Sequence, residues 1–84
     1  MTADEVLQQF TEILRGLIGD DSIVLTAATR RPDVPGWDSF NYVNFMVAVE
    51  MKFGIKFRVA EVEGFQAVGE IVARTLALLD ARRK

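Results

Sequence analysis

The chain has 84 residues, half of them hydrophobic, and a formal net charge of −2 from 12 acidic and 10 basic residues. It contains neither cysteine nor histidine, which excludes disulfides, thiolate nucleophiles and the commonest general base and metal ligand. This composition is typical of a small globular domain and argues against a self-sufficient hydrolase or a zinc domain. We therefore expect a single domain over residues 1–84, with no catalytic residue and no metal site.

The distribution of charge and apolar residues narrows the range of partners. Residues 1–40 hold seven acids and three bases, a net of −4, and residues 41–84 hold five acids and seven bases, a net of +2. No nucleic-acid partner is expected, because such binders show a strongly basic patch. The longest apolar run, residues 45–49, is far shorter than the ~20 residues of a membrane span. Without an apolar leader at its start, the chain is expected to be cytoplasmic, and we expect a monomer.

The first predicted helix begins after Thr2 and ends at Gly19. Thr2 and Glu5 have the spacing of a capping box, and glycine is a common left-handed helix end. Residues 20–37 form a long loop, in which the apolar residues 23–25 indicate packing on the core. The helix places seven apolar residues on one face: Val6, Leu7, Phe10, Ile13, Leu14, Leu17 and Ile18.

The second predicted helix starts at Asp38 or Ser39, both good N-caps, and ends near Phe53, before Gly54. It carries two apolar stripes. The first comprises Tyr42, Phe45, Met46, Val49 and Phe53, and the second comprises Phe40, Val43, Val47 and Met51, with Asn44 in its middle. A helix in a small bundle needs one buried stripe, so the second must meet the same core, a ligand or a partner.

The sequence after Gly54 predicts two more helices. Residues 55–58 alternate apolar and basic side chains in a short extended link, residues 59–63 form a short helical turn, and residues 66–81 form the last helix. The basic tail at residues 82–84 suits a helix C-terminus. The apolar face of the last helix comprises Phe65, Val68, Val72, Leu76 and Leu79, with Ile71 beside it. The predicted fold is all-α: a small bundle of three main helices plus one short helix, with a long loop between the first two.

Ser39 is the side chain best placed to take part in a reaction, because it follows a loop and opens a helix. As an enzyme nucleophile it would need an adjacent base, which a chain without histidine does not offer. Two interpretations remain open. Ser39 is a plain helix cap, or it accepts a group installed by another enzyme. A phosphodiester formed there would face free backbone N–H groups and the positive end of the helix dipole.

The residues around Ser39 resemble the attachment motif of acyl carrier proteins. Residues 36–40 read Gly-Trp-Asp-Ser-Phe, and that family reads Asp-Ser-Leu before an apolar helix. The similarity continues through Glu50, residues 53–55 and residues 68–72. The spacing from Ser39 to Val68 fits the family without a gap, and length, acidic balance and helix order also agree.

The resemblance implies that Ser39 carries a covalent 4′-phosphopantetheine arm, with Asp38 as a supporting motif residue. A phosphopantetheinyl transferase installs the arm from coenzyme A with Mg²⁺. The arm's thiol holds acyl intermediates as thioesters for acyl-loading and acyl-processing enzymes of fatty-acid, polyketide or other specialised biosynthesis. Such a protein is a carrier and not an enzyme, and tethering raises the effective concentration of its cargo.

The chain departs from the family at Asn44, Met51 and Lys52, where acids are common. We therefore expect partners to dock through apolar contacts with a weak salt dependence, as is expected when few charges cross an interface. In the alternative, the second stripe packs against the long loop. A net charge of only −2 favours a specialised carrier over a general fatty-acid carrier. The expected partner-binding residues are Phe40, Val43, Asn44, Val47, Met51 and Glu61.

Two other functions stay open at this point. An aminoacyl or peptidyl carrier is one, although that subfamily more often has Gly-Gly-His-Ser, which residues 36–39 do not match. A cofactor-free helical interaction module is the other, with Ser39 as a cap. Trp37 is expected to pack on the bundle. Arg30 and Arg31 could touch a phosphate, but solvated loop charges are the default expectation.

Overall fold

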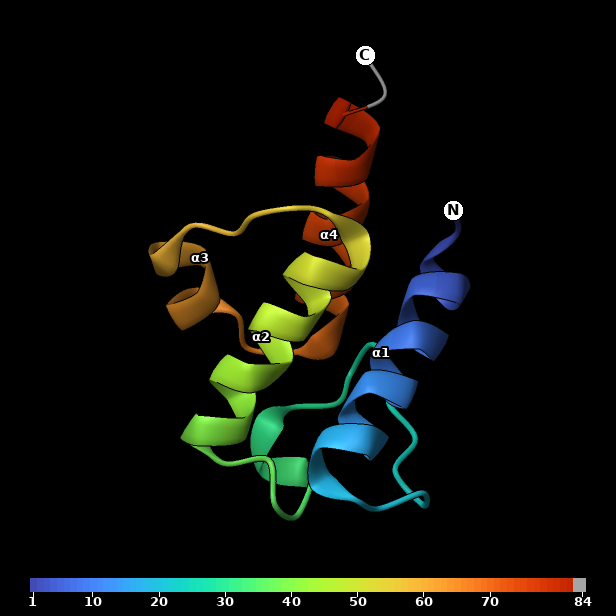
Figure 1. The fold of residues 1–84 in the computed structure, drawn as a ribbon, viewed down its shortest axis with the longest axis vertical. Coiled ribbons are helices and arrows are strands. Elements are labelled where there is room, and N and C mark those ends of the chain that lie inside the picture. Colours follow the sequence, from blue (N-terminus) through green and yellow to red (C-terminus); the bar gives the residue numbers. More distant parts are fainter. Residues whose placement is uncertain (83–84) are drawn as a thin grey trace.

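The computed structural model describes residues 1–82, which fold into four α-helices with no β-strand among them (Figure 1). In chain order they are α1 (Ala3–Ile18), a short 3₁₀ turn η1 (Arg31–Asp33), α2 (Ser39–Phe53), α3 (Val59–Gly64) and α4 (Val68–Arg82). The predicted all-α bundle of three main helices and one short helix is confirmed. The expected basic tail continues into Arg83 and Lys84, which lie outside the described residues. None of the helices within residues 1–82 combines the length and apolar character needed to cross a membrane.

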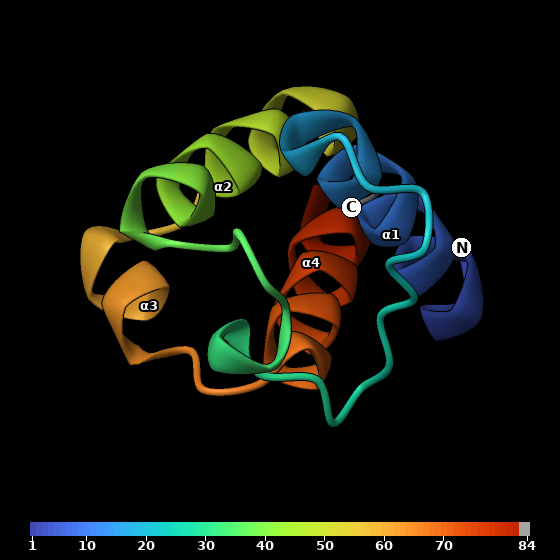
Figure 2. The same ribbon diagram turned by 90° about the horizontal axis from the view of Figure 1, so that it is seen from below.

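Of the three long helices, α1 runs in the opposite direction to α2 and α4. α1 packs against both α2 and α4, and it runs downward in Figure 1, whereas α2 and α4 run upward. The start of α1 and the end of α4 therefore lie at the same end of the bundle. The first turn of α2 lies at the opposite end, beside the long loop, and Figure 2 looks onto that end.

The first helix forms as its local sequence predicts. The Thr2 N–H donates to Glu5 Oε1 at 2.8 Å and the Glu5 N–H donates to Thr2 Oγ1 at 3.2 Å, which completes the capping box. At the other end Gly19 has a φ of 79°, and its N–H donates to the Arg15 carbonyl. Both ends of α1 are thus fixed by contacts within a few residues.

The core joins the apolar faces of α1 and α2. The Phe10 ring of α1 meets the rings of Phe45 and Phe53 edge-to-face, with centroids 5.4 Å and 5.8 Å apart. Such aromatic pairs add to the gain from burying apolar area. The first apolar stripe of α2 is buried apart from the half-buried Tyr42, as predicted.

The long loop packs onto the bundle at fixed points. Ile23 and Leu25 are buried while Val24 between them is exposed, so two of the three apolar residues reach the core. Arg15 Nε donates to the Ile23 carbonyl at 2.7 Å, and the Leu25 N–H donates to Thr11 Oγ1 at 3.3 Å. These bonds hold the first half of the loop against α1.

The last helix starts at Val68, two residues after the predicted start at 66. The Val68 N–H donates to the Thr29 carbonyl at 2.8 Å and the Gly69 N–H donates to the Ala27 carbonyl at 2.9 Å. The loop backbone therefore satisfies donors that open the helix. A β-carbon at Gly69 would lie 2.9 Å from the Ala27 carbonyl oxygen. Only glycine therefore fits where the start of α4 meets the long loop.

Two further differences from the predicted helices concern α3 and α4. α3 extends to Gly64, one residue beyond the predicted turn. In α4 the fully buried set includes a polar residue, Thr75, that the apolar pattern did not indicate. Its hydroxyl donates to the Ile71 carbonyl at 2.8 Å, which satisfies the buried hydroxyl within the helix.

Candidate functional site

Ser39 is the first residue of α2, and its neighbour Asp38 is the residue that caps the helix. The Asp38 Oδ1 atom accepts a hydrogen bond from the Asn41 N–H at 2.8 Å. The Asn41 side chain in turn donates to the Gly36 carbonyl at 2.9 Å. The interpretation of Ser39 as the cap is therefore wrong. Its side chain is exposed and its hydroxyl plays no part in holding the first turn.

The residues before Ser39 anchor it to the core. Gly36 has a φ of +88°, a conformation that suits glycine, and a β-carbon there would lie 3.0 Å from Ile18 Cγ2. Trp37 is only 4% exposed, and its ring meets Phe45 edge-to-face with centroids 5.2 Å apart. The prediction that Trp37 packs on the bundle is confirmed. An exposed serine is thus held next to a buried tryptophan.

Arg31 of the η1 turn reaches the same serine. Its Nη1 atom donates to Ser39 Oγ at 3.3 Å, and its guanidinium carbon lies 5.4 Å from the centre of the Tyr42 ring. Arg31 is exposed, in line with the default expectation of a solvated charge, but its guanidinium also contacts Ser39 and Tyr42. Sequence spacing gave no signal for this contact, because it depends on how the loop returns to the start of α2.

Tyr42 lies between this site and α3. Its hydroxyl donates to the Val62 carbonyl at 2.6 Å, which ties α2 to α3. Burial raises the pKa of Tyr42, and the nearby Arg31 charge opposes that rise. A cavity of about 20 Å³ adjoins Arg31, Trp37 and Tyr42. Because a water molecule needs about 10–15 Å³, this cavity has room for a water molecule but not for an acyl chain.

The donor groups around Ser39 Oγ suit a phosphodiester. The N–H groups of Ser39 and Phe40 open α2, and neither donates a hydrogen bond to any of residues 1–82. They lie at the positive end of the helix dipole, and Arg31 adds a guanidinium beside the hydroxyl. A phosphate group on this oxygen would therefore meet both neutral and charged donors.

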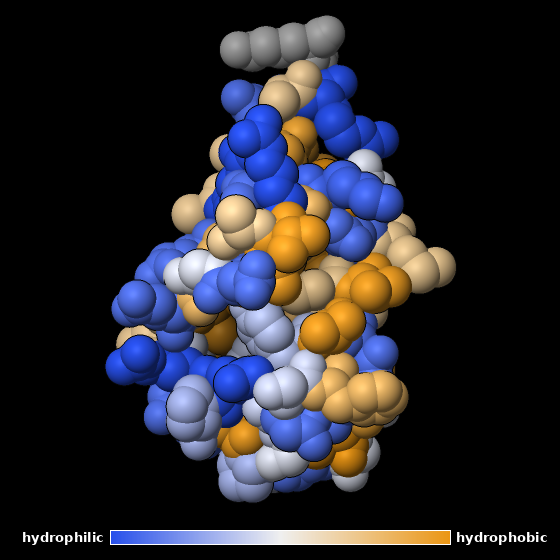
Figure 3. Space-filling view, turned by 90° about the vertical axis from the view of Figure 1, so that its left-hand side faces the viewer, coloured by the Kyte–Doolittle hydropathy of each residue, from blue (hydrophilic) through white to orange (hydrophobic). Residues whose placement is uncertain are grey.

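The second apolar stripe of α2 is exposed along its length. The residues of this stripe are between 47% and 79% exposed: Phe40, Val43, Val47 and Met51. Figure 3 shows apolar surface toward its right-hand side, on the side of the molecule where α2 lies. The alternative, in which this stripe packs against the long loop, is wrong. Asn44, in the middle of the stripe, is partly exposed.

Glu61 of α3, also an expected partner residue, already has contacts within the chain. Its carboxylate accepts a hydrogen bond from the Arg58 N–H at 3.0 Å and pairs with Arg74 of α4. The Arg58 bond and, less strongly, the Arg74 contact hold the pKa of Glu61 below its usual value. The structure therefore joins α3 to α4 through Glu61, while Ser39 and the exposed stripe lie on α2.

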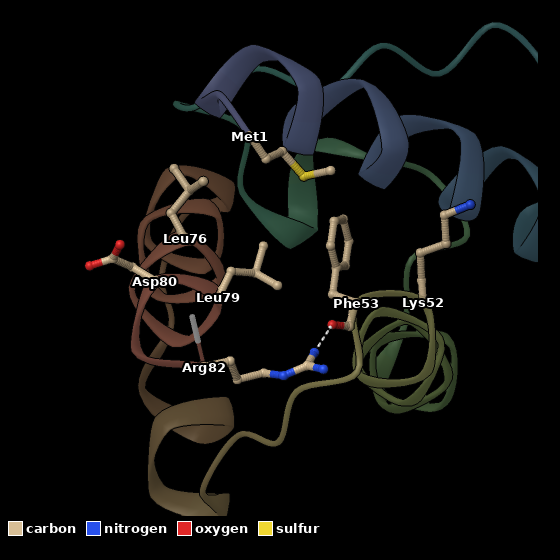
Figure 4. A pocket seen from close by; sticks show the side chains of 7 residues that line it. All are labelled: Met1, Lys52, Phe53, Leu76, Leu79, Asp80 and Arg82. Carbon is tan, nitrogen blue, oxygen red and sulfur yellow. Dashed lines mark hydrogen bonds between the residues drawn. The ribbon is translucent and has the colours of Figure 1, made fainter. Parts of the chain in front are cut away.

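A large groove lies at the other end of the bundle from Ser39. Its volume is about 690 Å³, and Figure 4 shows Met1, Phe53 and Leu79 among the side chains around it. Below them Arg82 Nη1 donates to the carbonyls of Phe53 and Gly54, each at 2.8 Å, and so closes the end of α2. The groove is thus separate from the Ser39 site.

Comparison with known proteins identifies the fold. No protein-family model matches the chain, and no curated protein sequence matches it. Among solved structures, it is similar to the holo acyl carrier protein from Geobacter metallireducens, solved by NMR in solution. The two chains are 34% identical, with a TM-score of 0.84 over 92% of this chain and 88% of that chain. This chain therefore belongs to the acyl carrier protein family and is a carrier protein.

Proposed function

We propose that this chain is an acyl carrier protein that bears 4′-phosphopantetheine on Ser39. The observation that carries the proposal is the exposed Ser39 hydroxyl: it lies at the start of α2 and does not cap the helix, because Asp38 does the capping. When bound, the arm supplies a thiol that holds acyl groups as thioesters. The absence of cysteine from the chain is compatible with this role, because the cofactor brings its own sulfur.

The chain's part in attachment is to present the hydroxyl and to hold the product. We propose that Ser39 Oγ forms a bond to a phosphorus of coenzyme A while the diphosphate bond of coenzyme A breaks. The hydroxyl proton passes to a base of the phosphopantetheinyl transferase, which also holds the Mg²⁺, and adenosine 3′,5′-bisphosphate leaves. Asp38 keeps the first turn of α2 formed, and the N–H groups of that turn face the new phosphodiester.

The exposed stripe on α2 is the proposed docking surface for partner enzymes. Its members are apolar or neutral: Phe40, Val43, Asn44, Val47 and Met51. Glu61 of α3 is proposed as a further partner contact. Contiguous exposed apolar surface commonly marks an interaction site. The partners would be the transferase and acyl-loading and acyl-processing enzymes, which meet the chain as a monomer. The neutral surface and the net charge of −2 favour a specialised biosynthetic pathway.

Intact mass spectrometry tests the attachment. The purified chain is first shown to be unmodified, and is then incubated with a promiscuous phosphopantetheinyl transferase, coenzyme A and Mg²⁺. A mass gain of one phosphopantetheine is expected for the wild type and for Ser22→Ala, the control at the only other serine, but not for Ser39→Ala. Circular dichroism checks that each variant is folded. A folded, unmodified wild-type chain that gains no mass would instead be a cofactor-free interaction module.

A further inference from the structure

Arg31 is held beside Ser39 by the fold of the long loop. The Arg30 N–H donates to Asp33 Oδ2 at 2.9 Å, and the Val34 N–H donates to the Arg31 carbonyl at 3.2 Å. Val34, directly after the η1 turn, is buried. The backbone of Arg31 is therefore fixed on both sides, and its side chain has a defined starting point for reaching α2.

The guanidinium of Arg31 makes two contacts on α2 but no ion pair with any of residues 1–82. The one ion pair found within residues 1–82 joins Arg74 to Glu61, so no carboxylate neutralises Arg31 at close range. The Tyr42 ring lies under the guanidinium and holds it by a cation–π contact. The Ser39 hydroxyl, its side-chain hydrogen-bond partner, is neutral. An anionic oxygen in the same place would be a stronger acceptor for this donor.

We propose that Arg31 binds the phosphodiester of the loaded carrier and so fixes the root of the arm. The proposal rests on the proposed function, because it takes Ser39 as the attachment point. A guanidinium presents several N–H donors in one plane, which suits the non-bridging oxygens of a phosphate. Since Nη1 already lies 3.3 Å from Ser39 Oγ, the contact needs no rearrangement of the loop. Arg31 then binds the phosphodiester of the loaded chain, whereas Asp38 caps α2 in the apo and loaded chains alike.

The test compares apo and loaded chains by NMR, after intact mass has confirmed the loading of each sample. In the wild type, the Arg31 side-chain N–H resonances are expected to shift on loading, while those of Arg30 stay in place. The ³¹P resonance of the phosphodiester is expected to shift in Arg31→Gln relative to the wild type. Arg30→Gln is the matched control. It removes the same charge from the neighbouring residue, whose side chain makes no hydrogen bond to Ser39.

A second variant and a second readout separate binding from general charge effects. Arg31→Lys keeps the charge but loses the planar donor set, so its ³¹P resonance is also expected to differ from the wild type. Loading is expected to raise the melting temperature more in the wild type than in Arg31→Gln. The wild-type comparison needs no substitution, so a variant that fails to fold does not prevent the test.

The outcomes separate this proposal from the proposed function. If loading is confirmed by mass but the Arg31 resonances do not shift, the role of Arg31 is overturned while the carrier function stands. A ³¹P shift of equal size in Arg30→Gln would also overturn it, since only a diffuse charge effect would then be present. A folded, unmodified wild-type chain that gains no mass overturns both proposals.

Discussion

Asp38 caps α2 and leaves its neighbour Ser39 free. The Asp38 carboxylate accepts the Asn41 N–H at 2.8 Å, whereas the Ser39 hydroxyl interacts with Arg31. Structural support and the proposed chemistry therefore belong to adjacent side chains. The division matters because a serine that also capped the helix would lose that contact whenever its hydroxyl was modified.

The two adjacent side chains are expected to differ in their effect on stability. Asp38→Ala should lower the free energy of unfolding by about 1 kcal/mol, the usual loss for an N-cap. Ser39→Ala should change it by less than about 0.5 kcal/mol, as is usual for exposed side chains without a structural role. Urea unfolding of the apo chains measures both. A loss in Ser39→Ala as large as in Asp38→Ala would show that Ser39 caps the helix after all.

Substitution by alanine should lower the free energy of unfolding strongly at Trp37 but hardly at Phe40, three positions later. Trp37 is buried against Phe45, so Trp37→Ala should lower the free energy of unfolding by about 3–5 kcal/mol. Phe40 is 75% exposed, so Phe40→Ala should change it by no more than about 0.5 kcal/mol. Thermal or urea unfolding gives both values. Similar losses for the two variants would contradict the assignment of Phe40 to an exposed docking surface.

The docking surface can be tested with the transferase as the partner. Met51→Ala should lower kcat/KM for loading by about tenfold, the effect of losing about 1.4 kcal/mol of binding. Val24→Ala, at an exposed apolar residue of the long loop, should leave it unchanged. Adding salt should change kcat/KM only slightly, because few charges lie on the proposed docking surface of α2. A steep fall with salt would contradict the proposal that apolar contact dominates docking.

The acid stability of the fold should depend in part on Glu61. Its contacts with the Arg58 N–H and Arg74 lower its pKa in the folded chain below the usual 4.5. A depressed folded pKa gives stability that is present above pH 4.5 and is lost as the pH falls through the folded pKa. Glu61→Gln should therefore reduce stability at pH 7 and flatten its decline between pH 5 and 3, both taken as approximate bounds. Unfolding curves across that range measure the difference, and an unchanged pH profile would show that the contacts have no energetic effect.

The features that the sequence predicted well depend on neighbours close along the chain. The Thr2–Glu5 capping box and the left-handed Gly19 fix the ends of α1 through contacts within five residues, and the left-handed Gly54 ends α2. The buried stripe of α2 follows from helical periodicity alone. Asp38 and Ser39 could not be told apart as caps from sequence, because both residue types are favourable there.

The features that the sequence missed depend on distant parts of the chain. α4 begins at Val68 because carbonyls of the long loop accept its first N–H groups. Arg31 reaches Ser39 because the η1 turn brings the loop back across the start of α2. Residue spacing carries no signal for either contact, since a loop without periodicity does not reveal its path. Part of the candidate site therefore became visible only in the folded chain.

Peptide mapping of the loaded chain tests the central claim most directly. Trypsin should release residues 31–52, which contain Ser39, separately from residues 16–30, which contain Ser22. The account predicts that the phosphopantetheine mass is found on residues 31–52 and that fragment ions place it at Ser39. The same mass on residues 16–30, or no added mass on a folded chain that was unmodified before incubation, would contradict the account.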